Sequence, residues 1–404
     1  MLARAIHTLQ VLIWAQPIEM MVSIAFLCVI GVIAGTGTSV LIGQRRHKLA
    51  LSMRGAFPGL VLLLFSLADW ALLGALPRLR LSFSEQIAAP LLASVGLRLV
   101  ILWCLLTASL LTLWRERRRG VTANTRGVAI LFILVNLAFS AVQVDAYVVE
   151  PLLVDTTALS LAYEDLDPGT SPVRVVHLSD THIERSSYRE ASVVQKVNAL
   201  QPDIIVLTGD YLNLSRLQDP VSAAHFRQFA SQLRAPYGIY AVRGSVEPTM
   251  GSMQWLVEGT HVTWLEQEAH TIEVHGQEVT LVGVACSHRP DVDAARLDKA
   301  MADVPSDAFT LLLYHSPDLI AEAAEWGIDL YLGGHTHGGQ LRLPFYGAIV
   351  TSSMYGKQYE AGLYGRDGTT LYISRGIGFE GGGMPRARFL CRPEIVSLEL
   401  GGTQ

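Results

Sequence analysis

The sequence predicts two different halves: a membrane region of four spanning α-helices over residues 1–150, and an α/β domain over residues 173–404. Charged residues make up only 17% of the 404 residues, while 50% are hydrophobic, and soluble globular chains carry roughly 25% charged residues. The apolar excess lies before residue 150. After residue 173, short apolar runs alternate with helical segments, a pattern typical of a two-sheet β-sandwich flanked by helices. Residues 151–172 are expected to link the halves.

The first half contains four long apolar stretches. Each exceeds the ~20 residues that a helix needs to cross a bilayer core. Four buried helices of a soluble domain would need a covering layer that the sequence lacks. A cleaved signal peptide is disfavoured because a basic cluster, and not a small-residue cleavage site, follows the first stretch. The expected spans are residues 20–43, 56–77, 87–114 and 127–149.

Basic loops predict the orientation of these helices. Short loops rich in Lys and Arg stay cytoplasmic, and the clusters at residues 45–54 and 115–126 flank alternate ends of the spans. The C-terminal domain is therefore expected to be extracytoplasmic, in an integral membrane protein whose Arg-rich, Lys-poor membrane half is typical of a bacterial inner membrane. A structural ion pair is expected between Asp69 and Arg98 within the spans, and a transport or substrate role is the alternative. Asp145 is expected near the outer interface, where it can reach headgroup water.

Overall charge and cysteine content exclude little else. A net charge of −5, a pI near 6.2 and the lack of a basic patch argue against a nucleic-acid partner. Two of the four cysteines, Cys286 and Cys391, lie in the second half. A disulfide between them is permitted outside the cytoplasm, and two buried free thiols are the alternative.

The second half contains apolar, β-prone runs bounded by polar turns, with helical segments between some of them. A His-Gly turn at 275–276 joins two of the runs into a hairpin. The expected strands are residues 173–179, 203–208, 238–243, 271–274, 279–284, 309–314, 328–332, 371–374 and 395–400. The expected helices are residues 188–200, 221–233 and 317–326.

Metal-competent side chains follow four of these strands. Asp180 and His182, and again His335 and His337, stand at i and i+2, and strand geometry sends such pairs to the same side, where each can converge on one cation. Open α/β sheets build their sites at the carboxyl ends of strands. One His-X-His alone is more often chance than ligand, but four such strand ends predict a metal site. Asp210 and His315 supply the other two ends.

Six motifs identify the family that the second half resembles. They are Asp-Thr-His at 180–182, Thr-Gly-Asp at 208–210, Tyr-His-Ser-Pro-Asp at 314–318, Gly-His-Thr-His-Gly-Gly-Gln at 334–340, Ser-Arg-Gly-Ile-Gly at 374–378 and Cys-Arg-Pro-Glu-Ile at 391–395. With these motifs, residues 173–400 resemble the calcineurin-like metallophosphoesterase superfamily, in particular its membrane-associated bacterial branch. The resemblance covers a little over half of the chain, and the membrane half carries no comparable signature.

The resemblance implies a role for each ligand. Asp180, His182 and His337 would hold one metal, His315 and His335 the second, and Asp210 would bridge both. Two divalent cations ~3.5–4 Å apart can clamp a phosphate ester and activate a water for in-line attack. His and carboxylate ligands without Cys suit Mn, Fe or Zn, and the spacing does not choose among them.

One motif departs from the family pattern. Where the family has Gly-Asn-His followed by an acid, this chain has Gly244, Ser245, Val246 and Glu247. Ser245 is expected to replace Asn as a neutral ligand, directly or through water, whereas Val246 cannot transfer a proton. This departure keeps open an alternative, a non-catalytic membrane protein that binds metal or a phosphorylated ligand. A transporter built from the four helices is the third possibility.

The substrate is expected to be a phosphate ester, hydrolysed by a phosphatase or phosphodiesterase reaction. A site beside the membrane favours a phospholipid, a lipid-linked or an envelope phosphate, with membrane lipids as further partners. That expectation rests on analogy of fold alone. Substrate phosphate would be contacted by Arg375, Arg386 and Arg388, for which ion pairs are the alternative role.

Overall fold

The structure is a computed structural model. It describes residues 140–403 apart from 185, 214–216, 248–252 and 380–385, together with single residues before them (114, 118, 134, 137 and 138). The chain divides into two compact units, residues 1–145 with 382–386, and residues 146–381 with 387–404.

The four predicted membrane spans lie outside the described residues, except for single positions and the end of the last span. That end is helical from residue 140 and continues as the π-helix η3 (Asp145–Val149) and the 3-10 helix η4 (Glu150–Leu152). Within the described part of the chain, no helix is both long and apolar enough for a membrane span.

The second unit is built on two six-stranded sheets. The first has the order β1-β14-β2-β3-β4-β5, and the second the order β12-β13-β9-β8-β7-β6. The strands of the first sheet are β1 (Asp155–Tyr163), β2 (Val173–Leu178), β3 (Ile204–Leu207), β4 (Ile239–Val242), β5 (Val262–Leu265) and β14 (Glu394–Gly402). Those of the second are β6 (Gln267–Val274), β7 (Gln277–Val284), β8 (Thr310–Leu313), β9 (Leu330–Gly333), β12 (Gly362–Arg366) and β13 (Thr369–Ile373).

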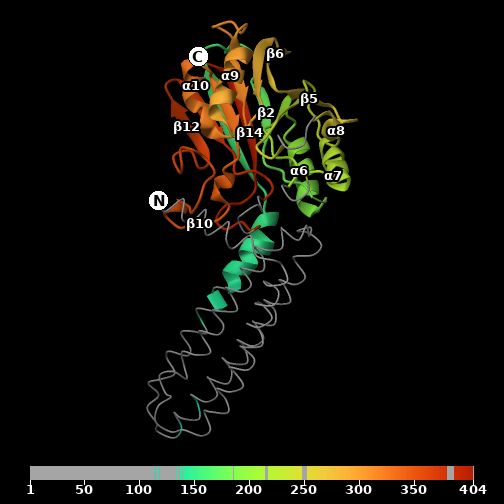
Figure 1. Cartoon of the computed structure of the whole chain (residues 1–404), viewed down its shortest axis with the longest axis vertical. Helices are drawn as coiled ribbons and strands as arrows, with labels where there is room; N and C mark the ends of the chain where they lie inside the picture. The colour runs from blue at the N-terminus through green and yellow to red at the C-terminus, as the bar shows by residue number, and fades with distance from the viewer. Residues whose placement is uncertain are drawn as a thin grey trace. The chain divides into compact units, whose positions relative to one another are not determined.

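Helices cover the outer face of each sheet, as Figure 1 shows. One face carries α6 (Tyr188–Ala199), α7 (Pro220–Ala230) and α8 (Gln254–Val257), and the other carries α9 (Pro290–Met301), η7 (Pro317–Leu319) and α10 (Ile320–Glu325). Alternate strand residues face opposite layers: Val175 of β2 lies in the core between the sheets, and Val176 lies beneath the helices. A short hairpin of β10 (Arg342–Leu343) and β11 (Gly347–Ala348) follows the 3-10 helix η8 (His337–Gly339).

The helix-flanked two-sheet sandwich is confirmed, and the expected strands and helices are present with shifts of a few residues at their ends. The expected link over residues 151–172 is corrected, because β1 lies there and pairs in parallel with β14 from Asp155 to Tyr163. Its side chains alternate between half-buried and exposed, so the apolar run that signals a buried strand is missing. β5, β12 and α9 are further elements that were not expected from the sequence. Cys286 and Cys391 are buried free thiols, which excludes a disulfide between them.

Candidate metal centre

The carboxyl ends of four strands bring the metal-competent residues together. β2 and β3 are parallel neighbours in one sheet, and β8 and β9 are parallel neighbours in the other. Backbone hydrogen bonds join the loops that follow them: Asp180 donates to the carbonyl of Gly209 at 3.0 Å, and Gly334 donates to that of His315 at 2.6 Å. The backbone N–H of His335 reaches across to the Asp180 carboxylate at 3.1 Å. The two sheets therefore share one site at this edge.

The side chains are aimed by left-handed backbone and not by strand geometry. Asp180, His182, Asp210, His335 and His337 all have positive φ, between 41° and 69°. Non-glycine residues seldom adopt this region, and such residues gather at functional sites. Strand alternation was expected to bring each i, i+2 pair to one cation, and this explanation was wrong. Asp180 and His182 do lie in the same group of possible ligands, but His335 and His337 lie in two different groups.

The first group consists of Asp180, His182 and His337, all buried. The Nε2 atoms of the two histidines face each other at 3.1 Å, and their rings stack with centroids 4.9 Å apart. Asp180 Oδ1 lies 3.3 Å from His337 Nε2. Two nitrogens and a carboxylate oxygen thus converge within the reach of a single cation.

The second group consists of Asp210, His315 and His335. His335 Nδ1 lies 3.2 Å from His315 Nε2, and Asp210 Oδ2 lies 3.2 Å from the same His315 nitrogen. The other nitrogen of His315, Nδ1, hydrogen-bonds to the Thr208 carbonyl at 2.6 Å. A histidine that ligates a metal commonly donates its second N–H in this way, which fixes the tautomer and the ring.

Asp210 lies between the two groups. Its Oδ2 is 3.2 Å from His315 of the second group and 3.7 Å from His182 Nε2 of the first. Ser245 Oγ donates to both carboxylate oxygens at 3.2 and 3.0 Å, and the N–H of Val246 donates to Oδ1 at 3.0 Å. The position suits the predicted bridging role. Ser245 is in contact with this carboxylate, and its role as a direct metal ligand stays a prediction.

The electrostatics of the site divide its histidines into two kinds. Burial lowers the pKa of His335 to about 3 and that of His337 well below its ordinary value, so both are neutral near pH 7. Burial also opposes charge on His315, but the neighbouring Asp210 and Asp180 raise its pKa to about 10. Burial opposes charge on Asp210 as well and raises its pKa, yet His315 holds the pKa of Asp210 well below its ordinary value. Asp210 and His315 therefore form an ion pair within the site.

The donor set fits two divalent cations. Each group brings two imidazole nitrogens close together inside the protein, at 3.1 and 3.2 Å, so that both can bind the same cation. Imidazole and carboxylate ligands without sulfur suit Zn, Fe or Mn. The six side chains form the two groups that the sequence analysis expected, and Asp210 is the member best placed to serve both.

Glycines allow the loops to approach one another closely. A Cβ added to Gly334 would overlap Ser179 Oγ and the Asp180 carboxylate, and one added to Gly244 would overlap the backbone N of Asp210. Only a residue without a side chain fits at such contacts. These glycines therefore set the distance between the loops that carry the ligands.

The three arginines expected to contact substrate have different surroundings. Arg388 is fully buried and donates to the carbonyls of Gly376, Gly378 and Cys391, so its expected substrate contact is corrected to a structural role. Arg375 pairs with Glu394 at 3.1 Å and stays a prediction as a substrate contact. Arg386 belongs to the first unit, and its role also stays a prediction.

Two residues near the site were missed as functional candidates. Glu247 is buried and accepts hydrogen bonds from the backbone of Gly244, Asp210 and Tyr211 at 2.7–3.0 Å, so it holds the Ser245 loop against the Asp210 loop. His288 hydrogen-bonds through Nε2 to the Ser245 carbonyl at 2.7 Å, and its ring centroid lies 6.1 Å from that of His335. Glu247 follows the altered motif directly, a signal that could have been used. His288 stands in a loop with no motif around it.

Comparisons with known proteins agree with this geometry. The model of the calcineurin-like phosphoesterase family matches residues 173–339. The chain is 31% identical to the metallophosphoesterase YkuE of Bacillus subtilis, over 63% of this chain and 88% of YkuE. It is 28% identical to the phosphodiesterase YaeI of Escherichia coli, over 57% of this chain and 83% of YaeI.

A third relative is named for its substrate. The chain is 25% identical to the UDP-2,3-diacylglucosamine pyrophosphatase LpxG of Chlamydia muridarum, over 62% of this chain and 90% of LpxG. The family match, the extent of the YkuE alignment and the two ligand groups lead to one conclusion. The chain belongs to the calcineurin-like metallophosphoesterases and is a metal-dependent phosphoric ester hydrolase with a centre for two divalent metal ions.

Proposed function

We propose that this phosphoesterase is attached to a membrane by its N-terminal half, lies outside the cytoplasm and hydrolyses a phosphate ester carried by a lipid or another envelope molecule. The observation that carries the catalytic part is the position of Asp210, whose Oδ2 lies within 3.7 Å of a histidine from each group. The apolar character of residues 1–150 and the basic loops within them support the location.

The residues of the metal centre would have different roles in hydrolysis. Asp180, His182 and His337 would hold one cation, and Asp210, His315 and His335 the other. Cations held there would clamp the phosphate and lower the pKa of a water between them. Ser245 orients the Asp210 carboxylate through its two hydrogen bonds, and Glu247 fixes the loop on which Ser245 stands.

The chemistry of the leaving group limits the classes of substrate that the site can hydrolyse. Val246 is buried beside Asp210 and has no proton to give. Without an acid at this position, esters whose leaving group is weakly basic are favoured, such as aryl phosphates and phosphoanhydrides. LpxG is named as a pyrophosphatase of a diacylated sugar nucleotide. This relationship supports a phosphoanhydride attached to a lipid as the substrate class.

The test of hydrolysis uses the purified full chain loaded with Mn²⁺ and an aryl phosphate ester, with Asp210→Asn as the inactive control. We expect hydrolysis by the natural chain and close to none by the variant. A chain that binds two metals per molecule yet hydrolyses neither this ester nor a panel of lipid-linked phosphates would instead be the non-catalytic binding protein that the change to Ser245 and Val246 keeps open.

The location has a separate test. Alkaline phosphatase fused after Gln404 should be active, because it would lie outside the cytoplasm, and a fusion after Arg119 should be inactive. The reverse pattern would overturn the extracytoplasmic location and leave the hydrolysis result untouched.

A further inference from the structure

An exposed apolar segment adjoins the metal centre. Residues 343–354 run through β10, the hairpin tip and β11, and six of their large apolar side chains are exposed by 48% or more. Phe345 at the tip is fully exposed. We call this segment the apolar hairpin, and its exposed side chains are Leu343, Phe345, Tyr346, Ile349, Val350 and Met354.

The apolar hairpin and its flanks have a small positive net charge. Residues 341–360 contain Arg342, Lys357 and Glu360 and no other charged residue, which gives a net charge of +1. Arg342 pairs at 2.6 Å with Glu360, whose side chain is only 15% exposed. Lys357 is more exposed than Arg342, and its Nζ lies 3.9 Å from the other oxygen of Glu360 and 3.5 Å from the centre of the Tyr346 ring. An aromatic residue and a lysine thus stand together beside an apolar tip.

The apolar hairpin continues into the segment where the second unit begins. The N–H of Arg342 donates to the carbonyl of Phe389 at 3.0 Å, and the N–H of Leu390 donates to the carboxylate of Glu150 at 2.8 Å. Leu390 is half exposed. Exposed apolar side chains flank Glu150 as well, and they are Val149, Leu152 and Leu153. Three segments therefore form one apolar edge.

The same edge adjoins the second ligand group. His335 hydrogen-bonds to the backbone at Ser352, and a Cβ on Gly339 would overlap Ala348 of β11. Figure 1 shows β10 at the end of the unit opposite to β6. A surface that covered the apolar edge would therefore lie next to the metal centre.

We propose that the apolar edge docks on the surface of a lipid bilayer that contains anionic lipid, with Phe345 inserted among the acyl chains. Tyr and Lys beside apolar residues are typical of the membrane interface, where the ring and the ammonium reach the headgroups. Protein interfaces, in contrast, are depleted of Lys. The docked surface would present the metal centre to phosphates at headgroup depth. The proposal rests on the membrane attachment proposed above.

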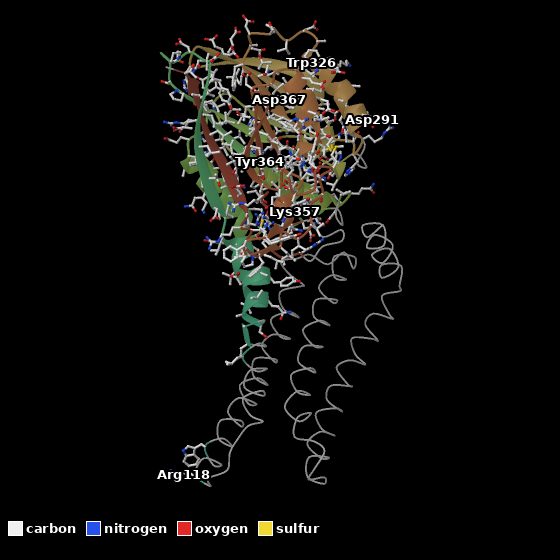
Figure 2. The ribbon with its side chains drawn as sticks, turned by 90° about the vertical axis from the view of Figure 1, so that its left-hand side faces the viewer. Arg118, Asp291, Trp326, Lys357, Tyr364 and Asp367 are labelled. Atoms are coloured by element: carbon white, nitrogen blue, oxygen red, sulfur yellow. The ribbon has the colours of Figure 1, made fainter. Side chains whose placement is uncertain are left out.

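The test measures the depth of single positions in the full chain, reconstituted in nanodiscs of phosphatidylcholine and phosphatidylglycerol. A nitroxide is attached to Phe345→Cys, and to Val350→Cys in case the first variant fails to fold. Asp367→Cys is the matched control, because its side chain is 81% exposed and lies at the end of the unit away from Lys357 (Figure 2). The buried Cys286 and Cys391 are expected to react poorly, and the natural chain treated with the label gives the background.

The quantity measured is the ratio of the label's accessibility to oxygen over its accessibility to a water-soluble nickel complex. Docking predicts that this ratio is several-fold higher at position 345 or 350 than at position 367. Equal accessibility at all three positions would overturn the proposal. Spin–spin broadening at 345 without increased oxygen contact would assign the edge to a second copy of the chain, and would overturn it too. Neither result would alter hydrolysis of a soluble aryl ester, so the proposed function is judged separately.

Discussion

Asp210 is the residue on which both ligand groups depend. Replacing it with Asn removes the negative charge that faces His315 at 3.2 Å and His182 at 3.7 Å. Losing a residue that only hydrogen-bonds to a metal ligand typically lowers metal affinity or activity by ~10–100-fold. We expect Asp210→Asn, which changes a ligand itself, to lower both metal affinity and hydrolysis by more than this. The variant should keep its fold, and metal content by mass spectrometry is the measurement. Asp291→Asn, an exposed carboxylate on α9, is the control and should behave like the natural chain. Unchanged metal in Asp210→Asn would refute the ligand assignment.

Ser245 and Val246 determine which leaving groups the enzyme tolerates. Ser245→Asn combined with Val246→His restores an amide beside Asp210 and a proton donor at a buried position. A general acid contributes ~10²–10⁴-fold, chiefly when the leaving group is strongly basic. The double variant should therefore accelerate the hydrolysis of alkyl phosphate esters more than that of aryl esters, measured as kcat/KM for a matched pair. An equal effect on both esters would mean that the site needs no acid at this position.

His315 makes metal uptake depend on pH. Its pKa of about 10 in the metal-free protein, against an ordinary value of 6.5, keeps it protonated near pH 7. Metal binding requires the neutral ring, so uptake at pH 7 should release about one proton. Titration calorimetry in two buffers of different ionisation enthalpy measures that release, and its absence would contradict the ion pair with Asp210.

The same shift affects the stability of the metal-free protein. Because the folded pKa of His315 lies above the ordinary value, its contribution to stability is fully present below about pH 6.5 and is lost as the pH rises through about 10. Metal affinity should change in the opposite direction over this interval and rise with pH.

At the scale of the elements, close contact between loops holds the ligands in place. Gly334→Ala should displace Asp180, because the added Cβ would overlap the carboxylate and Ser179 Oγ. We expect ~10–100-fold weaker metal binding, with the circular dichroism of the folded protein retained. Gly365→Ala on β12 is the control, since its Cβ would meet no described atom within 4 Å. Equal metal affinity in the two variants would show that the loop contact does not position Asp180.

The elements also show what sequence reasoning could recover. The buried strands β2, β3, β8 and β9 were predicted because continuous apolar runs ended at polar residues, and those ends contain the six side chains of the two candidate ligand groups. The backbone at Asp180 and His335 could not be predicted, because its positive φ depends on hydrogen bonds between loops far apart in sequence. Arg388 was predicted to contact substrate phosphate, because its burial against backbone carbonyls cannot be recognised from the sequence.

At the scale of the whole molecule, the apolar composition of residues 1–150 predicted a membrane region, which lies mostly outside the described residues and stays a prediction. β1 was missed because an edge strand with one exposed face lacks a continuous apolar run, and its pairing with β14 joins residues more than two hundred positions apart.

The central claim is that two divalent cations occupy the site between β2, β3, β8 and β9. The most direct measurement is anomalous diffraction from crystals of the full chain loaded with Mn²⁺. We predict two peaks ~3.5–4 Å apart, one contacting Asp180, His182 and His337, the other contacting His315 and His335, with Asp210 between them. A single peak, or peaks that any of these six side chains fails to reach, would contradict this account.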